Sequence, residues 1–279
     1  METSKFSFDL PPELIAQLPA EYRDKSRLMV VNRKSSKLVH TSVTNLPELI
    51  PEGAVMVFNN SKVIPARLHG LDGKGRLIQF LLLEHMNEGF EWQVLTPNAK
   101  RFSTGKNFMF PENIRGVLIN TGFGHKLKLI FDSKITLDYL ERYGKMPLPP
   151  YINREVVDTD NERYQTVYAR KLGSVAAPTA GLHFTNELIE DLRDAGIIIG
   201  FVTLHVGIGT FLPIRSETIE NHQMHSEKYY IPEQTVRVVE SAKSENRPII
   251  AVGTTVVRSL ESAWNGKVLR RGSGISNLF

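Results

Sequence analysis

The residues best suited to chemistry include a histidine-containing segment, His222-Gln-Met-His225-Ser-Glu227. Two histidines three residues apart, with a carboxylate nearby, can ligate zinc, although the spacing is looser than in the two-histidine helix motif of metalloproteases. The same groups can supply a general base and the acid that orients it. A solvated turn after Glu220 is the alternative that involves no chemistry. The loose spacing makes a metal site the least favoured of these interpretations.

A second segment, Gly173-Ser-Val-Ala-Ala-Pro-Thr-Ala-Gly181, consists mostly of small residues. Small side chains cannot fill a core, so the backbone here is expected to approach another group closely. Thr185 can cap the helix that follows, whose N-terminus then presents N–H groups and a positive dipole end. That geometry suits a carboxylate, a phosphate or a planar ring. The alternative is a tight, flexible connection.

A third segment, Pro248-Ile-Ile-Ala-Val-Gly253-Thr-Thr255, has the pattern of a strand, a glycine turn and the start of a helix. Hydroxyl groups at a helix N-terminus form a cradle for an anion or an amino acid. Arg258 lies about one helical turn further on and can reach the same ligand. The lysine of a P-loop is absent, which argues against a nucleoside triphosphate. The alternative is a purely structural elbow.

A fourth segment, Thr203-Leu-His-Val-Gly-Ile-Gly-Thr210, ends a predicted strand. His205 has apolar neighbours, so it is either a core histidine satisfied by a backbone carbonyl or a functional group. Gly207 and Gly209 resemble the start of a dinucleotide fingerprint. The third glycine is absent and Pro213 interrupts any helix, so this is not a Rossmann site.

Two further polar segments lie nearer the N-terminus. Phe58-Asn-Asn-Ser-Lys-Val-Ile-Pro-Ala-Arg67 joins a buried strand to the region that follows, and its amides and Arg67 either read a base edge or a phosphate or close a turn. Arg23-Asp-Lys-Ser-Arg27 is a charged segment before a strand, for which a solvated loop is the simpler interpretation.

The elements that position these segments are of two kinds. Residues 1–65 are expected to form a short helix followed by strands at Leu28–Val31 and Ala54–Phe58. Between residues 66 and 132, short apolar runs alternate with Gly, Asn and Lys turns and show almost no helical period, which predicts a small β-barrel. The runs are Leu77–Leu83, Trp92–Leu95, Val117–Ile119 and Leu127–Phe131.

From residue 133 onward helices and strands alternate, which implies an α/β sheet with crossover helices. The predicted helices are Ile135–Tyr143, Glu187–Ala195, Glu233–Lys243 and Thr255–Trp264, and the predicted strands are Ile197–His205 and Ile249–Val252. The fold class is therefore mixed α/β (α+β). One split α/β domain, residues 1–65 and 133–279, would carry an inserted β-barrel domain, residues 66–132.

Composition narrows the function further. The 279 residues include no cysteine, which excludes disulfides, thiolate nucleophiles and cysteine-ligated metals. No signal peptide pattern and no run of roughly 20 apolar residues is present, so a cytoplasmic protein without membrane contact is expected. The net charge of +4 favours polyanions such as RNA only slightly.

Taken together, these segments closely resemble the S-adenosylmethionine:tRNA ribosyltransferase-isomerase family over essentially the whole chain. Ala176–Thr185 and Thr203–Phe211 carry the most specific motifs of this resemblance, and the β-rich insertion is the least distinctive part. His225, Glu227, Gly253–Thr255 and Arg258 also match. The other matching segments are Phe8–Gln17, Arg23–Leu28, Asn59–Arg67, Met146–Tyr151, Arg163–Tyr168 and Val252.

The resemblance implies a reaction. The substrate would be a tRNA with 7-aminomethyl-7-deazaguanine at the anticodon wobble position. The ribosyl part of S-adenosylmethionine would be transferred to the aminomethyl nitrogen and rearranged, giving epoxyqueuosine and releasing adenine and methionine. S-adenosylmethionine would be a consumed co-substrate, and no metal or redox cofactor is expected. The partners would be the anticodon arm of tRNA and S-adenosylmethionine, and we expect a monomer.

Proton transfers dominate such a reaction, and histidine titrates nearest neutral pH. We expect catalytic roles for His183, His205 and His225, with Glu227 as an orienting partner or alternative base. The residues expected to bind substrate are Asn59, Ser61, Arg67, Pro178, Thr179, Gly181, Gly207, Gly209, Thr210, Gly253, Thr254, Thr255 and Arg258. Among them Gly253–Thr255 and Arg258 would hold a carboxylate or phosphate, and the Pro178–Gly181 loop would lie against adenosine or the target base.

Two alternatives remain open at the level of sequence. Members of the family continue beyond the point that matches Phe279, which allows a tRNA-binding protein without activity. A metal-dependent hydrolase built on His183, His205, His222 and His225 is the second alternative. Neither explains the small-residue loop and the Gly-Thr-Thr elbow together.

Overall fold

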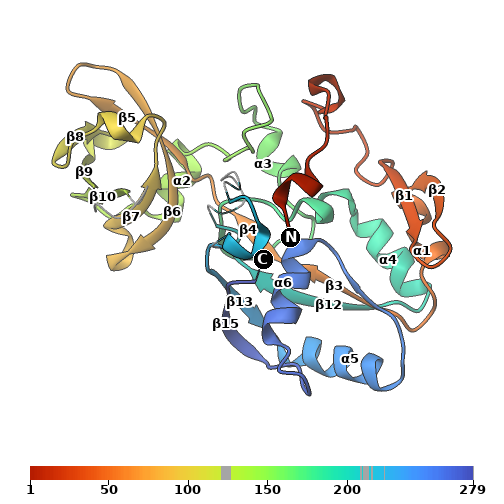
Figure 1. The fold of residues 1–279 in the computed structure, drawn as a ribbon. Helices are drawn as coiled ribbons and strands as arrows, with labels where there is room; N and C mark the ends of the chain where they lie inside the picture. Colours follow the sequence, from red (N-terminus) through yellow and green to blue (C-terminus); the bar gives the residue numbers. More distant parts are fainter. Residues whose placement is uncertain (121–126, 208, 210–213, 215, 223, 279) are drawn as a thin grey trace.

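Two groups of strands organise the molecule, a closed barrel and a mixed sheet covered by helices (Figure 1). The computed structural model describes residues 1–120, 127–207, 209, 214, 216–222 and 224–278. The mixed α/β fold class and the barrel expected from the sequence are both confirmed.

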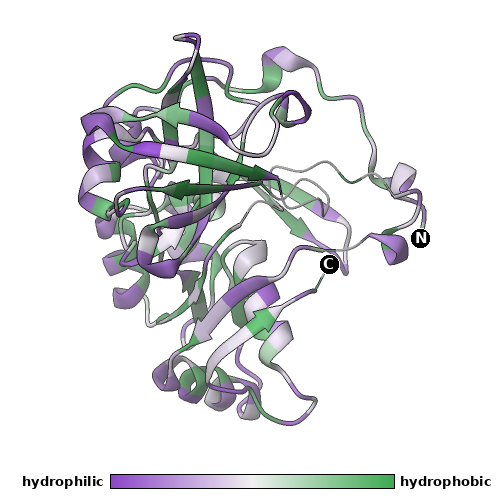
Figure 2. Cartoon of the chain, turned by 90° about the vertical axis from the view of Figure 1, so that its left-hand side faces the viewer, coloured by the Kyte–Doolittle hydropathy of each residue, from purple (hydrophilic) through white to green (hydrophobic). Residues whose placement is uncertain are grey.

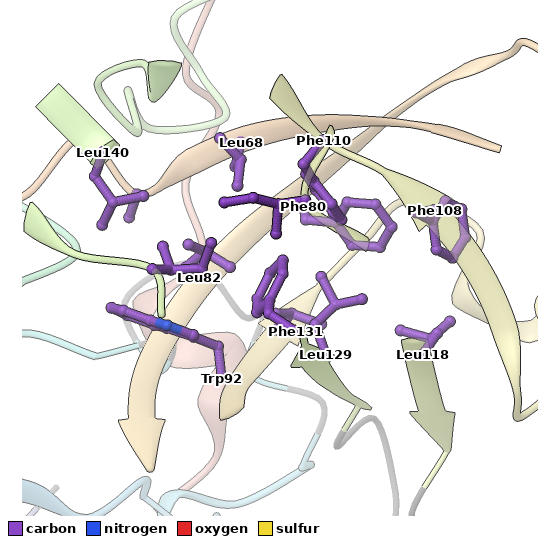
Figure 3. Close-up of a cluster of buried hydrophobic side chains, with 14 of the residues drawn as sticks. Leu68, Phe80, Leu82, Trp92, Phe108, Phe110, Leu118, Leu129, Phe131 and Leu140 are labelled. Carbon is purple, nitrogen blue, oxygen red and sulfur yellow. The ribbon is translucent and has the colours of Figure 1, made fainter. Parts of the chain in front are cut away.

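The barrel closes in the strand order β10-β7-β6-β5-β8-β9. Alternating residues of each strand point inward, because successive side chains of a strand face opposite sides of a sheet. Figure 3 shows the interior filled by aromatic and aliphatic side chains, with the rings of Phe80 and Phe108 4.9 Å apart in an edge-to-face contact. The strands are β5 Arg67–Asp72, β6 Leu77–Met86, β7 Glu91–Leu95, β8 Lys106–Met109, β9 Arg115–Asn120 and β10 Leu127–Phe131.

The second group is a five-stranded sheet in the order β14-β3-β12-β13-β15. The strands β14, β3 and β12 run parallel to one another. Strand β13 pairs antiparallel with β12, and β15 pairs antiparallel with β13. The strands are β3 Val55–Asn59, β12 Ile198–Leu204, β13 Glu227–Ile231, β14 Ile249–Ala251 and β15 Gly272–Ser276. The short strand β4 (Ser61–Val63) pairs with β11 (Lys171–Ser174) beyond this sheet.

Helices cover the two faces of the five-stranded sheet. The alternation of β3 places Met56 and Phe58 against α4 (Asn186–Asp194) and places Val55 and Val57 against the opposite pair, α5 (Glu233–Ser244) and α6 (Thr254–Ala263). Hydrophobic residues gather on the strands, while loops and outer helix surfaces carry most hydrophilic residues (Figure 2).

Helix starts follow the capping signals of the sequence. The Thr185 hydroxyl accepts a hydrogen bond from the Leu188 N–H at 3.1 Å, which confirms it as the cap of α4. Thr136 caps α2 in the same way, through the Tyr139 N–H. The remaining short helices are α1 Leu46–Leu49, α2 Leu137–Tyr143 and α3 Asp160–Arg163.

The N-terminal segment differs from expectation. In place of the predicted short helix, the structure has two 3₁₀ turns, Thr3–Phe6 and Pro12–Leu14. Prolines at 11 and 12 disrupt helical hydrogen bonding, and the large apolar residues of the segment are exposed, so no tertiary packing stabilises a helix there.

A hairpin follows this segment, in which β1 (Arg27–Asn32) pairs with β2 (Lys37–Ser42), a strand that the sequence pattern did not indicate. No helix within the described residues is long and apolar enough to cross a membrane.

Candidate active site

The candidate site lies where the three parallel strands end. β3 ends at Asn59, β12 at Leu204 and β14 at Ala251, so the segments that follow them meet at one edge of the sheet. Open α/β sheets bind ligands at this edge. Gly253 follows β14 with φ +86°, and a Cβ there would lie 3.2 Å from the Cβ of Ala180, so the glycine elbow and the small-residue loop approach closely.

A cavity of about 560 Å³, here called the loop cavity, lies between the small-residue loop (Ala176–Ala180) and the elbow (Gly253–Thr255). Its walls are mostly apolar with a few polar groups, as is typical of small-molecule sites. Of the predicted site residues it contains Pro178, Thr179, Gly253, Thr254 and Thr255. The other lining residues are Pro149, Pro150, Tyr151, Tyr164, Ala176, Ala177, Ala180 and Val206.

Two polar groups of the loop cavity stand out. The Thr255 Oγ1 atom is buried and has no hydrogen-bond partner within the described part of the chain. It lies in the first turn of α6, whose backbone N–H groups are the positive end of the helix dipole. Burial raises the pKa of Tyr164 to about 12, so its phenol stays neutral at pH 7. The cavity thus offers hydrogen-bond donors and an aromatic wall without a charged side chain.

A second cavity of about 480 Å³, the histidine cavity, shares Thr254 and Thr255 with the first. It is lined by His222, His225 and Glu227, together with Gly209, Ile214, Met224, Val257, Arg258 and Leu278. His225 is exposed, while the Glu227 side chain is only 4% exposed. An exposed imidazole beside a ligand-sized space can exchange protons with a bound substrate.

Glu227 and Arg258 form a buried ion pair. The other Glu227 oxygen, Oε1, accepts the Gly207 N–H at 2.9 Å, and Arg258 Nε donates to the Leu278 carbonyl at 3.0 Å. The charge of Arg258 is therefore already matched by a carboxylate. An anionic ligand held by Arg258 and the Gly253–Thr255 segment together would have to share this guanidinium with Glu227.

The three predicted catalytic histidines do not meet. His205 follows the end of β12 and lies in a recess with Lys228 and Tyr230, whereas its neighbour Val206 lines the loop cavity. Burial, and then the nearby charge of Lys228, lower the pKa of His205, and its Nδ1 is buried without a partner among the described residues.

His183 is exposed and faces a third cavity, which contains Arg23 and Arg163. A joint role of all three histidines at one reacting centre therefore does not fit their placement. No group of three His, Cys, Asp or Glu side chains in the described ranges is arranged to hold a metal ion. A zinc site built on the histidines thus has no support from their arrangement.

Other predicted binding residues have structural partners. Asn59 is buried, and its side chain bonds to the Leu204 N–H and carbonyl and to the Ser61 N–H. Ser61 is buried as well, and its Oγ has no partner among the residues described. The Asn59 contacts join β3, β4 and β12, which gives Asn59 a structural role.

Three further residues that were expected to bind substrate, Gly181, Gly209 and Arg67, have close contacts within the protein. A Cβ on Gly181 would lie 2.0 Å from the Tyr168 hydroxyl, so this glycine is required by packing and lies outside the loop cavity. A Cβ on Gly209 would lie 3.2 Å from His225. Arg67 donates to the Leu148 carbonyl at 2.9 Å, and burial lowers its pKa. Thr210 lies outside the described residues.

The sequence reasoning missed three residues that wall the loop cavity, Pro149, Tyr151 and Tyr164. They belong to the segments Met146–Tyr151 and Arg163–Tyr168, which carried the family resemblance without being assigned a role. The run of prolines before Tyr151 was the available signal, because a stiff connector beside an aromatic residue can form a rigid wall.

The fold is that of an α/β protein, with two adjoining cavities as its candidate ligand site at the carboxyl ends of the parallel strands. A family model described as "Queuosine biosynthesis protein" matches residues 3–279. The chain belongs to this family.

Named relatives agree with the family model. The S-adenosylmethionine:tRNA ribosyltransferase-isomerase of Treponema denticola is 48% identical over 286 residues, covering 100% of this chain and 82% of that protein. The enzyme of the same name from Natranaerobius thermophilus is 43% identical over 283 residues, with the same coverage of 100% and 82%. A crystal structure of S-adenosylmethionine tRNA ribosyltransferase from Thermotoga maritima is 32% identical, covers 98% of this chain and 77% of that one, and has a TM-score of 0.46.

Proposed function

We propose that this enzyme transfers and isomerises the ribosyl group of S-adenosylmethionine onto 7-aminomethyl-7-deazaguanine at the wobble position of tRNA. Adenine and methionine leave, and epoxyqueuosine remains in the tRNA. The full-length match to relatives of that name supports the activity. The single structural observation that carries the proposal is the pair of adjoining cavities that share the lining residues Thr254 and Thr255.

The loop cavity suits a planar nucleoside. Its walls include Pro178, Tyr151 and Tyr164, and its polar end is the first turn of α6 with the Thr255 hydroxyl, which has no hydrogen-bond partner among the described residues. Apolar walls can sandwich a purine, while N–H and hydroxyl groups bond to its edge or to a sugar hydroxyl. In this proposal the adenosyl part of S-adenosylmethionine or the target base occupies this cavity.

His225 is the best placed of the histidines for proton transfer. It lines the cavity that adjoins the loop cavity, and its side chain is accessible to a ligand there. The reaction requires removal of a C5′ proton next to the sulfonium, a neutral amine for attack, and a proton for the departing adenine. A group titrating near neutral pH serves such steps, with a typical contribution of about 10²- to 10⁴-fold in rate.

Glu227 has a positioning role in this scheme. Its carboxylate is held by Arg258 and accepts the Gly207 N–H, so it fixes the backbone two residues before Gly209, which packs on His225. A carboxylate already paired with a guanidinium is a poor base, because protonating it would break that pair. We therefore assign the proton transfer to His225 and the positioning of the Gly207 backbone to Glu227.

Incubation of the protein with S-adenosylmethionine and tRNA carrying 7-aminomethyl-7-deazaguanine tests the function. Mass spectrometry should detect free adenine and epoxyqueuosine, and tRNA with guanine at the same position should give neither. Tight tRNA binding without consumption of S-adenosylmethionine would instead indicate a binding protein. Absence of both binding and products would refute the proposal.

The role of His225 has its own test. We expect His225→Ala to lower kcat by about 10²-fold or more while the affinity for S-adenosylmethionine changes little. His40→Ala is the matched control, because His40 is exposed on the β1–β2 hairpin outside the cavities. Equal turnover of the His225 variant and the wild type would remove His225 from the mechanism.

A further inference from the structure

A third cavity, here called the arginine recess, lies between the N-terminal segment and the segment 148–183 and has a volume of about 450 Å³. It contains three arginines, Arg23, Arg154 and Arg163, and one carboxylate, Asp160. The proposed function assigns it no ligand. Its wall residues Pro149, Tyr151, Tyr164 and Thr179 also line the loop cavity, so the two spaces adjoin.

One of the three arginines is neutralised. Arg154 makes a bidentate ion pair with Asp160, with both N–O distances 2.7 Å and with side-chain exposures of 20% and 4%. The Val157 N–H donates to the same carboxylate at 2.9 Å. This pair is complete in itself and has no charge left for a ligand.

Arg23 and Arg163 differ from Arg154 because no carboxylate of the described chain forms an ion pair with either. Arg23 donates to the carbonyls of Gln165, Leu182 and Glu162, and Arg163 donates to those of Glu21 and Ala20. Carbonyl groups satisfy N–H donors but carry no net charge. Two positive charges thus remain in the recess.

These two guanidinium groups interact with each other. Burial, and then the positive charge of Arg163, lower the pKa of Arg23, while Glu162 acts in the opposite direction. The Nε of Arg163 is buried and has no partner among the described residues. Like charges in a half-buried space repel, and an anion placed between them would remove the repulsion and could accept the free N–H.

We propose that the arginine recess binds an oxyanion, and that this oxyanion is a backbone phosphate of the RNA substrate next to the nucleotide in the loop cavity. The assignment to RNA rests on the proposed function. Arginine is the preferred side chain for phosphate, since its planar donors match the phosphate oxygens. The apolar part of the recess, Leu148, Pro149 and Ile152, would lie along the sugar of the same nucleotide.

The ion pair of Arg258 with Glu227 supports this placement. The elbow was expected to hold the anion, but Arg258 is paired with Glu227. In the arginine recess, in contrast, two arginines lack an acidic partner within the described ranges. The recess therefore offers an anionic substrate two guanidinium groups without an ion-pair partner in the described chain, whereas Arg258 already has one.

Substitutions that remove the charge test the proposal. Arg163→Gln and Arg23→Gln keep amide donors for the backbone carbonyls, and Arg163→Lys and Arg23→Lys keep the charge. Affinity for tRNA carrying 7-aminomethyl-7-deazaguanine is measured at several salt concentrations for each variant. We expect each Gln variant to bind about tenfold more weakly and to lower the salt slope by about 1, whereas the Lys variants keep the slope.

Arg247→Gln is the matched control. Arg247 also donates to a backbone carbonyl, that of Gly53, and is 22% exposed, but it lies outside the recess and pairs with Glu245. Its affinity for tRNA and its salt slope should equal those of the wild type. Thermal unfolding of every variant shows whether the fold is retained.

A measurement on the wild type covers the case in which a Gln variant fails to fold. An arginine-specific dicarbonyl reagent is applied with and without tRNA, and modified arginines are located by mass spectrometry. Protection of Arg23 or Arg163, but not of Arg247, supports the proposal. Absence of protection would overturn it.

Three other results would also contradict the proposal, each with a different meaning. Folded Gln variants with wild-type tRNA affinity and slope would show that the arginines only fasten the N-terminal segment. Weaker binding of S-adenosylmethionine with unchanged tRNA binding would identify its carboxylate as the anion. A wild type that does not bind tRNA would overturn the phosphate site. Wild-type protein that binds tRNA through the recess but releases no adenine would refute only the proposed reaction.

Discussion

At the scale of single residues, the chemistry of a side chain depended on its partner. Arg258 has the charge and the helical position expected of an anion ligand, yet it forms an ion pair with Glu227. Arg23, which had the simpler interpretation of a residue in a solvated loop, lies half-buried without an acidic partner within the described residues. The residue types could be read from the sequence, but the partners could not.

The Glu227–Arg258 pair gives the first prediction. Glu227→Ala leaves a buried guanidinium without a counter-charge, so we expect the free energy of unfolding to fall by about 3 kcal/mol. Glu227→Gln should lower the free energy of unfolding by less, since its amide oxygen can still accept a hydrogen bond from the Gly207 N–H. Denaturant unfolding measures both changes. The control is Glu261→Ala, at an exposed position of α6, the helix that carries Arg258, and it should change the free energy of unfolding by less than about 0.5 kcal/mol. An equal loss in Glu227→Ala and Glu261→Ala would contradict a buried pair.

His205 gives a prediction about pH. Its pKa is lowered in the folded state by burial, so the unfolded chain binds more protons as pH falls below about 6.5. The stability that the neutral His205 contributes is present above that pH and is lost on acidification. We expect the wild type to unfold more easily at pH 5 than at pH 7.5, and this difference to be smaller in His205→Gln. The pKa of His69 is also lowered by burial, so part of the difference should persist. An unchanged pH dependence in the variant would show that His205 does not contribute.

At the scale of elements, local patterns were reliable where one face of an element is buried. The predicted barrel strands, the strand at Ile197–His205 and the helix at Glu187–Ala195 all appear within one to three residues of their expected bounds. The strand β2 was missed because its first four residues are exposed, so no alternation marks it. The predicted N-terminal helix was wrong for the related reason that nothing covers its apolar side chains.

The third prediction concerns Gly181, the last glycine of the small-residue loop, because Tyr168 leaves no room for a larger residue there. Gly181→Ala would place a Cβ 2.0 Å from the Tyr168 hydroxyl. We expect a loss of about 1–3 kcal/mol in the free energy of unfolding. In the double variant with Tyr168→Phe, part of the loss should be recovered. Gly73→Ala is the control, since nothing lies within 4 Å of a Cβ there, and its stability should not fall. An unchanged free energy of unfolding in Gly181→Ala would mean that the loop can shift to make room for the added Cβ.

At the scale of the whole molecule, the chain passes from the five-stranded sheet to the barrel through β4, which follows β3 and precedes β5. Both polar groups of the buried Gln165 side chain bond to the backbone of Val63 in β4, and β4 pairs with β11. Lys228 of β13 also forms an exposed ion pair with Glu84 of β6, which contributes little to stability.

The fourth prediction is that turnover does not depend on a transition metal. The family resemblance implies proton transfers without a metal, so a chelator selective for transition metals should leave turnover unchanged while Mg²⁺ maintains the tRNA fold. Adenine release is measured before and after treatment with the selective chelator, and thermal unfolding confirms that the treated protein remains folded. Lost activity that zinc restores would indicate a metal-dependent mechanism.

The amino-acid sequence by itself determined the fold class, most of the strands and helices, and the segments that form the site. These depend on the spacing of apolar residues, on glycines and on caps, which act over a few neighbours along the chain. The segments Ala176–Thr185 and Val252–Thr255 could therefore be singled out by their residue types and order alone.

Only the tertiary structure decided which side chains face which cavity. The three histidines lie apart: His205 lines a recess with Lys228 and Tyr230, His225 lines the histidine cavity, and His183, at the end of a 3₁₀ turn, lines the arginine recess. Arg258 is drawn to Glu227, 31 positions earlier in the chain, and Arg23 meets Arg163 across 140 residues. Such pairings arise from long-range packing, which no local periodicity encodes.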